Sequence, residues 1–260
     1  MKRQLFPLIA FSALLFLAAC EEEDENNSNP PAGDPTVSLR YDFNYNGDDF
    51  NLNQYYPTEG GAQWRFTLAS FYLAKPAIMD DAGNATMLMP EYLIVRPENE
   101  SSDLGTVAAG HAHMFNIIVG VDEATNTENG AEGKQPSDFS DANHPLSPQP
   151  EGMYWSWASG YIFVKLEGEI DYDGDNQADT TFKYHLGTNN LRLDMSTMVH
   201  GDLAPGEELE MTMAIDYGMI EDNLDLNTEI LTMTMNNVPL AEKVMANFEK
   251  AISFSHRIKE

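Results

Sequence analysis

The sequence contains one cysteine, Cys20, and lacks the local signatures of common catalytic sites. With a single thiol no internal disulfide can form. No serine lies in a G-x-S-x-G elbow, no histidine pair has the H-E-x-x-H spacing, and there is no glycine-rich phosphate loop. We therefore expect a binding protein and not an enzyme.

Positive charge is scarce. The chain holds 14 Lys and Arg against 42 Asp and Glu, which gives a formal net charge of −28. Such a chain repels nucleic acid and anionic lipid surfaces, so we expect neither as a partner. The same charge attracts metal cations.

A long hydrophobic run is also missing, because the apolar stretch that begins at Leu5 ends at Ala19. This is too short for a stable membrane span, and with Lys2 and Arg3 before it the stretch is typical of a signal peptide, residues 1–19. Leu-Ala-Ala-Cys at its end resembles a lipobox, which makes Cys20 the predicted lipidation site. The alternative is an ordinary secretory leader with a chance cysteine.

Residues 20–35 are predicted to be a disordered tether that follows the lipidated cysteine. An acidic run at 21–25 precedes a stretch of Asn, Ser, Pro and Gly, none of which buries apolar area. We expect an outer-membrane lipoprotein held only by its lipid. The acidic run resembles the surface-export signal of Bacteroidetes lipoproteins, and it leaves a periplasm-facing and a cell-surface location open.

The remaining residues, 36–260, have the alternation of short strands separated by Gly, Asn, Asp and Pro. This pattern predicts an all-β fold, an antiparallel β-sandwich of Ig-like or jelly-roll-like type, as one domain. One strand is expected over 154–170. Apolar residues at helical spacing predict one C-terminal helix from Pro239 to about Phe254.

The sharpest local motif is D-Y-D-G-D-N-Q-A-D, residues 171–179. Oxygen ligands at alternate positions of a tight loop surround one hard cation, as in the short calcium loops of extracellular proteins. The alternative is an acidic hairpin turn. The predicted calcium ligands are Asp171, Asp173, Asp175, Gln177 and Asp179.

Histidine and tryptophan side chains could provide softer metal ligands than the carboxylates of this loop. His111 and His113 alternate, so on a strand they share a face and could hold one metal ion; equally, they could be exposed at a strand edge. His185 would face away from its apolar neighbours. His200, followed by glycine, is expected in a loop. Trp155 lies in GMYWSWASGYIF, which by itself is typical of a core strand.

Several stretches together resemble the MbnP-like proteins, a family of exported copper-binding β-sandwich proteins. They are FTLASFYLA (66–74), GVDEATN (120–126), HPLSP (144–148), GMYWSWASGYIF (152–163) and FKYHLGT (182–188). The resemblance implies a copper site of histidine imidazoles near a tryptophan, which some relatives oxidise to kynurenine. The matching positions are His185 with Trp155 or Trp157. Relatives often carry further histidines at the positions that Asn44 and Leu93 occupy in this chain. His111 and His113 could take the place of these missing histidines.

The sequence thus predicts a copper-binding envelope protein for storage, delivery or scavenging, with a structural calcium loop. Its partners would be the metal ion and an outer-membrane transporter or another envelope protein. The alternative is a calcium-stabilised surface module that binds a glycan or a protein and has no copper role.

Overall fold

The structure, a computed structural model, describes residues 33–128, 133–156 and 158–260. Our predictions for the leader, for Cys20 and most of the tether, and for Trp157 lie outside these residues. Within the described part of the chain, no helix has both the length and the apolar character needed to cross a membrane.

The larger of two sheets is built around the long strand β4 (Gln63–Met79). This strand pairs antiparallel with β8 (Gly110–Val119) on one side and with β10 (Gly160–Asp171) on the other. The strand order is β12-β8-β4-β10-β11-β14, with four short strands at the periphery. The other members are β12 (Leu193–Leu203), β11 (Thr180–Gly187), β14 (Leu231–Thr232), β3 (Tyr56–Pro57), β5 (Ala85–Met87), β6 (Tyr92–Val95) and β9 (Tyr154–Ser156).

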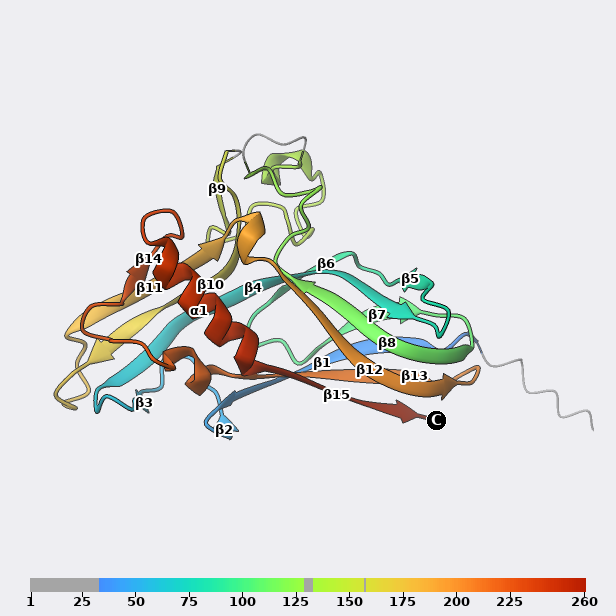
Figure 1. Cartoon of the computed structure of the whole chain (residues 1–260), viewed down its shortest axis with the longest axis horizontal. Helices are drawn as coiled ribbons and strands as arrows, with labels where there is room; N and C mark the ends of the chain where they lie inside the picture. The colour runs from blue at the N-terminus through green and yellow to red at the C-terminus, as the bar shows by residue number, and fades with distance from the viewer. Residues whose placement is uncertain (1–32, 129–132, 157) are drawn as a thin grey trace, which may run out of the picture. The chain divides into compact units, whose positions relative to one another are not determined.

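The smaller sheet has the order β15-β13-β1-β2, and β7 also pairs with β1 (Figure 1). β1 runs parallel to β13, as β11 does to β14, whereas the remaining pairs are antiparallel. The bounds are β1 (Thr36–Tyr45), β2 (Asp48–Asp49), β7 (Ser101–Thr106), β13 (Glu208–Asp216) and β15 (Ile252–Lys259). The prediction of an all-β sandwich is confirmed, with two parallel pairs among its strands.

An aromatic cluster fills part of the core between the sheets. Phe66 packs edge-on against Phe182 at 5.2 Å between ring centroids, and Tyr217 stacks on Phe50 at 4.1 Å. Each buried aromatic ring removes roughly 150–250 Å² from water and so contributes strongly to folding. This packed interior gives the side chains on the outer faces of the sheets a rigid support.

The one α-helix among the described residues, α1 (Val238–Ala251), lies near the predicted position. The side chain of Asn237 caps it by accepting a hydrogen bond from the amide of Leu240. Phe248 on its buried face packs against Phe71 of β4, with the rings 5.3 Å apart. The helix ends before Phe254, because Ile252–Lys259 pairs with β13 as strand β15.

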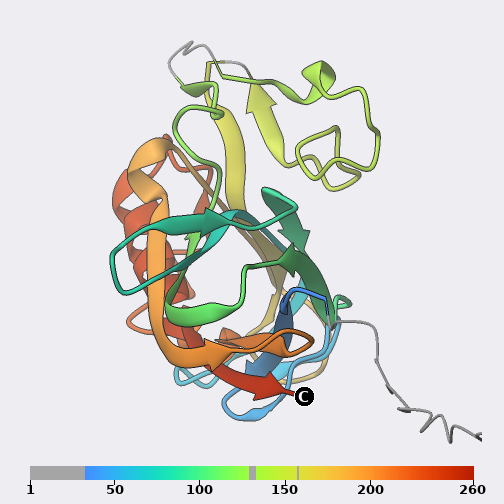
Figure 2. The same cartoon turned by 90° about the vertical axis from the view of Figure 1, so that its right-hand side faces the viewer.

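The stretch predicted as one strand over 154–170 is instead a hairpin. β9 ends at Ser156, and Gly160, with φ of 74°, begins β10 on the other side of the turn. Figures 1 and 2 show the described parts of the segment between β8 and β10 extending beyond the strand ends, with β9 among them. The 3₁₀ turns that lie wholly within the described residues are η2 (Pro136–Asp138), η3 (Asn189–Leu191) and η4 (Tyr217–Glu221).

Candidate metal centre

Two histidines begin strand β8, one on each side of a buried alanine. Ala112 is 2% exposed. Because successive side chains of a strand point to opposite faces, His111 and His113 share one face of β8, opposite to that of Ala112. Their side chains keep 34% and 30% exposure. The structure therefore places these two predicted ligands side by side, within reach of solvent.

A third histidine, His200, reaches the same face from β12. The pairing of β12 with β8 shifts register between Met198 and Gly201, and His200 in this interval has φ of 47°. Such a bulge leaves one residue out of the ladder and re-aims its side chain. The ring of His200 lies 4.5 Å from that of His113 between centroids. Our expectation of a loop position for His200 is wrong, because this residue belongs to a bulged strand.

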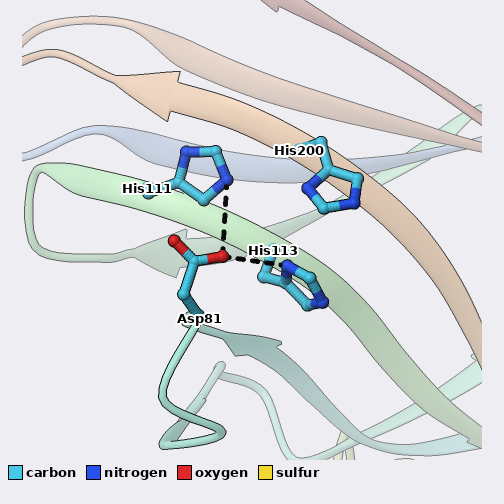
Figure 3. A group of neighbouring side chains, drawn as sticks. All are labelled: Asp81, His111, His113 and His200. Atoms are coloured by element: carbon cyan, nitrogen blue, oxygen red, sulfur yellow. Dashed lines mark ion pairs between the residues drawn. The ribbon is translucent and has the colours of Figure 1, made fainter.

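Asp81, just beyond the end of β4, supplies a carboxylate between the imidazoles (Figure 3). Its Oδ1 lies 3.0 Å from Nδ1 of His113 and 3.8 Å from Nε2 of His111. Asp81 and the three histidines, His200 included, each offer one ligand atom, and these four atoms all lie within 4.8 Å of one another. We call Asp81, His111, His113 and His200 the imidazole cluster.

Asp202 fixes the orientation of His111 within the cluster. Nδ1 of His111 lies 2.8 Å from Oδ1 of Asp202, which raises the pKa of His111 by a hydrogen bond. An ionised carboxylate only accepts hydrogen bonds, so in the neutral ring Nδ1 carries the proton and Nε2, the nitrogen nearer Asp81, keeps a free lone pair. A second carboxylate behind a ligating histidine is a common arrangement in metal sites.

His113 presents a nitrogen that lies against the carboxylate of Asp81 without hydrogen-bond geometry. Its Nδ1 is shielded from solvent and has no hydrogen-bond partner among the described residues, although it lies 3.0 Å from a carboxylate oxygen of Asp81. A buried nitrogen without a partner is costly. A metal ion shared with that carboxylate would satisfy both groups, so the donor set fits a metal bound by imidazole nitrogen and oxygen.

His185, the histidine of the H-L-G motif, lies elsewhere in the larger sheet. It is 7% exposed on β11, and its Nε2 lies 2.6 Å from Oε1 of Glu167. Burial lowers the pKa of His185, which the hydrogen bond to Glu167 partly offsets. β10 and β4 separate β11 from β8, and three strand spacings amount to about 14 Å. The structure therefore does not bring His185 together with His111 and His113.

Trp155 is brought close to the H-L-G motif. A Cβ atom on Gly187 would lie 2.7 Å from Cζ3 of Trp155, so the indole covers this glycine. Gly187 and His185 are two residues apart on β11 and share a face. Two of the five motifs that carry the family resemblance thus meet on one face of the sheet, with Trp155 half-buried.

The predicted calcium loop forms the hairpin between β10 and β11. Asp171, Asp173 and Asp179 offer carboxylate oxygens within 4.8 Å of one another. Asp175 is not part of this group and instead accepts hydrogen bonds from the backbone and side-chain nitrogens of Gln177. Three of the five predicted ligands are therefore placed together.

Comparison with known proteins agrees with the resemblance read from the sequence. The sequence model of the MbnP family matches residues 34–239. The solved structure described as MbnP from Methylosinus trichosporium superposes with a TM-score of 0.57 at 14% sequence identity. The alignment covers 85% of this chain and 98% of that chain, and at this identity it establishes a shared fold. A search of curated proteins found no significant match.

Proposed function

This chain belongs to the MbnP family, and we propose that it binds copper through the imidazole cluster as an envelope protein for storage, delivery or scavenging. The observation that carries the proposal is the convergence of His111, His113, His200 and Asp81, with all four ligand atoms within 4.8 Å of one another. Three different segments contribute these groups, so the convergence is a property of the fold.

The donor chemistry supports copper. Imidazole suits copper in both common oxidation states, and divalent copper binds nitrogen and oxygen ligands more tightly than the other divalent first-row ions. The family resemblance implies the same metal. The site is partly exposed, since the side chain of Asp81 is 67% accessible. Accessible ligands favour exchange with a partner, so we propose binding and transfer and no catalytic role.

Titration of the purified protein with Cu(II), in competition with a chelator of known affinity, tests the proposal. His113→Ala should weaken binding by at least about tenfold, because even outer partners of metal ligands contribute about that much. His256→Ala is the matched control, since His256 is exposed on β15, outside the cluster. Equal affinity of His113→Ala and the unaltered protein would refute the site.

Export and lipid anchoring at Cys20 complete the proposed function, with an outer-membrane transporter or another envelope protein as the recipient of the metal. The lipobox and the acidic run at 21–25 support this location. Two or more acyl chains anchor a protein stably, whereas one chain gives marginal binding. Labelled palmitate should be incorporated into the unaltered chain and not into Cys20→Ala. Incorporation into both would exclude Cys20 as the acceptor.

A structural calcium site is a second proposed property, supported by the carboxylates of Asp171, Asp173 and Asp179. Asp171 is fully buried and accepts hydrogen bonds from the amides of Gly174 and Asn176. The loop is thus held in a shape that gathers its carboxylates, and a hard cation would relieve their repulsion.

A further inference from the structure

Three methionines lie directly opposite one another on three neighbouring strands. Met114 of β8 pairs with Met79 of β4 on one side and with Met198 of β12 on the other. Residues directly opposite across antiparallel strands have Cβ atoms about 4.5–5.5 Å apart and share a face. We call Met79, Met114 and Met198 the methionine row.

The methionine row lies on the outer face of the sheet. Ile78 and Phe115, its paired neighbours on β4 and β8, are 6% and 0% exposed and face the core. Met198 is 47% exposed, beside the buried Val199. Large apolar side chains gain little by standing in water, so core packing does not account for the row.

Asn116 draws the sulfur of Met79 onto this face. Its side-chain amide donates a hydrogen bond to Sδ of Met79, over 2.6 Å. The sulfur therefore lies over β8, at Asn116, which is two residues along the strand from Met114. A thioether sulfur has two lone pairs, so this hydrogen bond leaves one for a metal.

The row is carried by the same three chain segments as the imidazole cluster. Asp81 follows Met79 by two residues, His200 follows Met198 by two, and His113 precedes Met114 directly. Because His113 and Met114 are consecutive on β8, their side chains point to opposite faces of the strand, so the row and the cluster are separate sites.

We propose that Met79, Met114 and Met198 form a thioether site for reduced copper, Cu(I), separate from the imidazole cluster. Soft, uncharged thioethers select Cu(I), whereas imidazole and carboxylate also hold Cu(II). Methionine is unbranched with three rotatable bonds, so three sulfurs in register can turn toward one ion. The site deepens the proposed copper function by adding a place for the reduced ion, but its ligands are independent of the cluster.

NMR of the full-length chain with ¹³C-labelled methionine methyl groups tests the proposal, with Ag(I) as a redox-inert substitute for Cu(I). The methyl signals of Met79, Met114 and Met198 should shift as Ag(I) is added. Met235, which is 73% exposed, serves as the internal control and should not shift at the same Ag(I) concentration. A shift of Met235 equal to those of the row would overturn the proposal.

Cu(I) affinity, measured in competition with bicinchoninate under ascorbate, gives a second test. M79L/M114L/M198L should bind Cu(I) at least about tenfold more weakly, whereas M235L should match the unaltered protein. Leucine conserves volume and should preserve the fold, which equal melting temperatures would verify. Unchanged Cu(I) affinity in the triple leucine variant would overturn the proposal.

A third variant separates this site from the imidazole cluster. H111A/H113A/H200A should lose Cu(II) binding and keep the Cu(I) site. If the unaltered protein binds Cu(I) but not Cu(II), the proposed imidazole site is refuted and the methionine site is retained. Loss of Cu(I) binding in the histidine variant would overturn the independence of the row.

Discussion

The imidazole rings of His113 and His200 meet edge to face, with centroids 4.5 Å apart and planes at 87°. They stand on adjacent strands, β8 and β12, and the bulge at His200 brings them together. This contact turns a histidine pair on one strand into a three-histidine group. Three imidazoles and one carboxylate make a donor set that a single metal ion can use in full.

Asp202 is expected to act on copper affinity without contacting the metal. Asp202→Asn removes the charge behind Nδ1 of His111 and should weaken Cu(II) binding by roughly 10- to 100-fold, because such partners orient the ligand and raise its basicity. Competition titration measures the effect. Asp194→Asn removes the same charge from the same strand and should leave affinity unchanged; equal losses in both variants would point to a general charge effect.

Calcium should stabilise the protein against heat. A ligand that binds only the folded state stabilises by RT ln(1 + [L]/Kd), about 2.7 kcal/mol at 100 times Kd. We expect the melting temperature to rise with calcium and fall with a chelator, and this response to vanish in D173A/D179A. D48A/D49A, which removes two exposed carboxylates elsewhere, is the control. A full calcium response in D173A/D179A would contradict the loop assignment.

Stability should fall in mild acid through His144. Burial lowers the pKa of His144, whose Nδ1 accepts a hydrogen bond from the amide of Leu146. Above about pH 6.5 the side chain is neutral in both folded and unfolded chains. Below about pH 6.5 the unfolded chain binds a proton at His144 before the folded chain does. The contribution of His144 to the free energy of unfolding is therefore lost as the pH falls toward the lowered pKa.

Melting temperature measured between about pH 7.5 and 5 gives the test, because this range spans the ordinary histidine pKa. His144→Asn retains an acceptor near Nδ1 but does not titrate, so its melting temperature should depend less on pH. His256→Asn, at an exposed position, should behave like the unaltered protein. The same acid sensitivity in His144→Asn would rule His144 out as the source.

Gly187 should not tolerate a side chain. A Cβ atom there would clash with the backbone oxygen of Tyr161 and would lie 2.7 Å from the indole of Trp155. Gly187→Ala should therefore cost about 1–3 kcal/mol, typical of overpacking, and alter tryptophan fluorescence. Urea unfolding measures the cost. Gly60→Ala, where the nearest atom is 4.0 Å away, is the control; equal stability of the two variants would disprove the clash.

Much of the architecture follows from local sequence pattern. The apolar-rich run at 64–74 and the stretch at 180–186 form strands whose apolar side chains are mostly buried. The spacing of Leu240, Val244 and Phe248 defines a helix because these side chains share its buried face. The family resemblance was equally readable, since motifs such as FKYHLGT are contiguous. The acidic loop at 171–179 is also local in sequence, and three of its carboxylates lie within 4.8 Å of one another.

The candidate metal centre depends on the tertiary structure. His200 and Asp81 come near His111 and His113 because of which strands pair and in which register. Strand pairing is not encoded in any one segment. The H-G-D sequence at 200–202 predicts a loop or turn, whereas the pairing of β12 with β8 places His200 in a β-bulge. The methionine row is invisible in the sequence for the same reason. Sequence determined which side chains each strand exposes, and the long-range pairing of strands decided which of them meet.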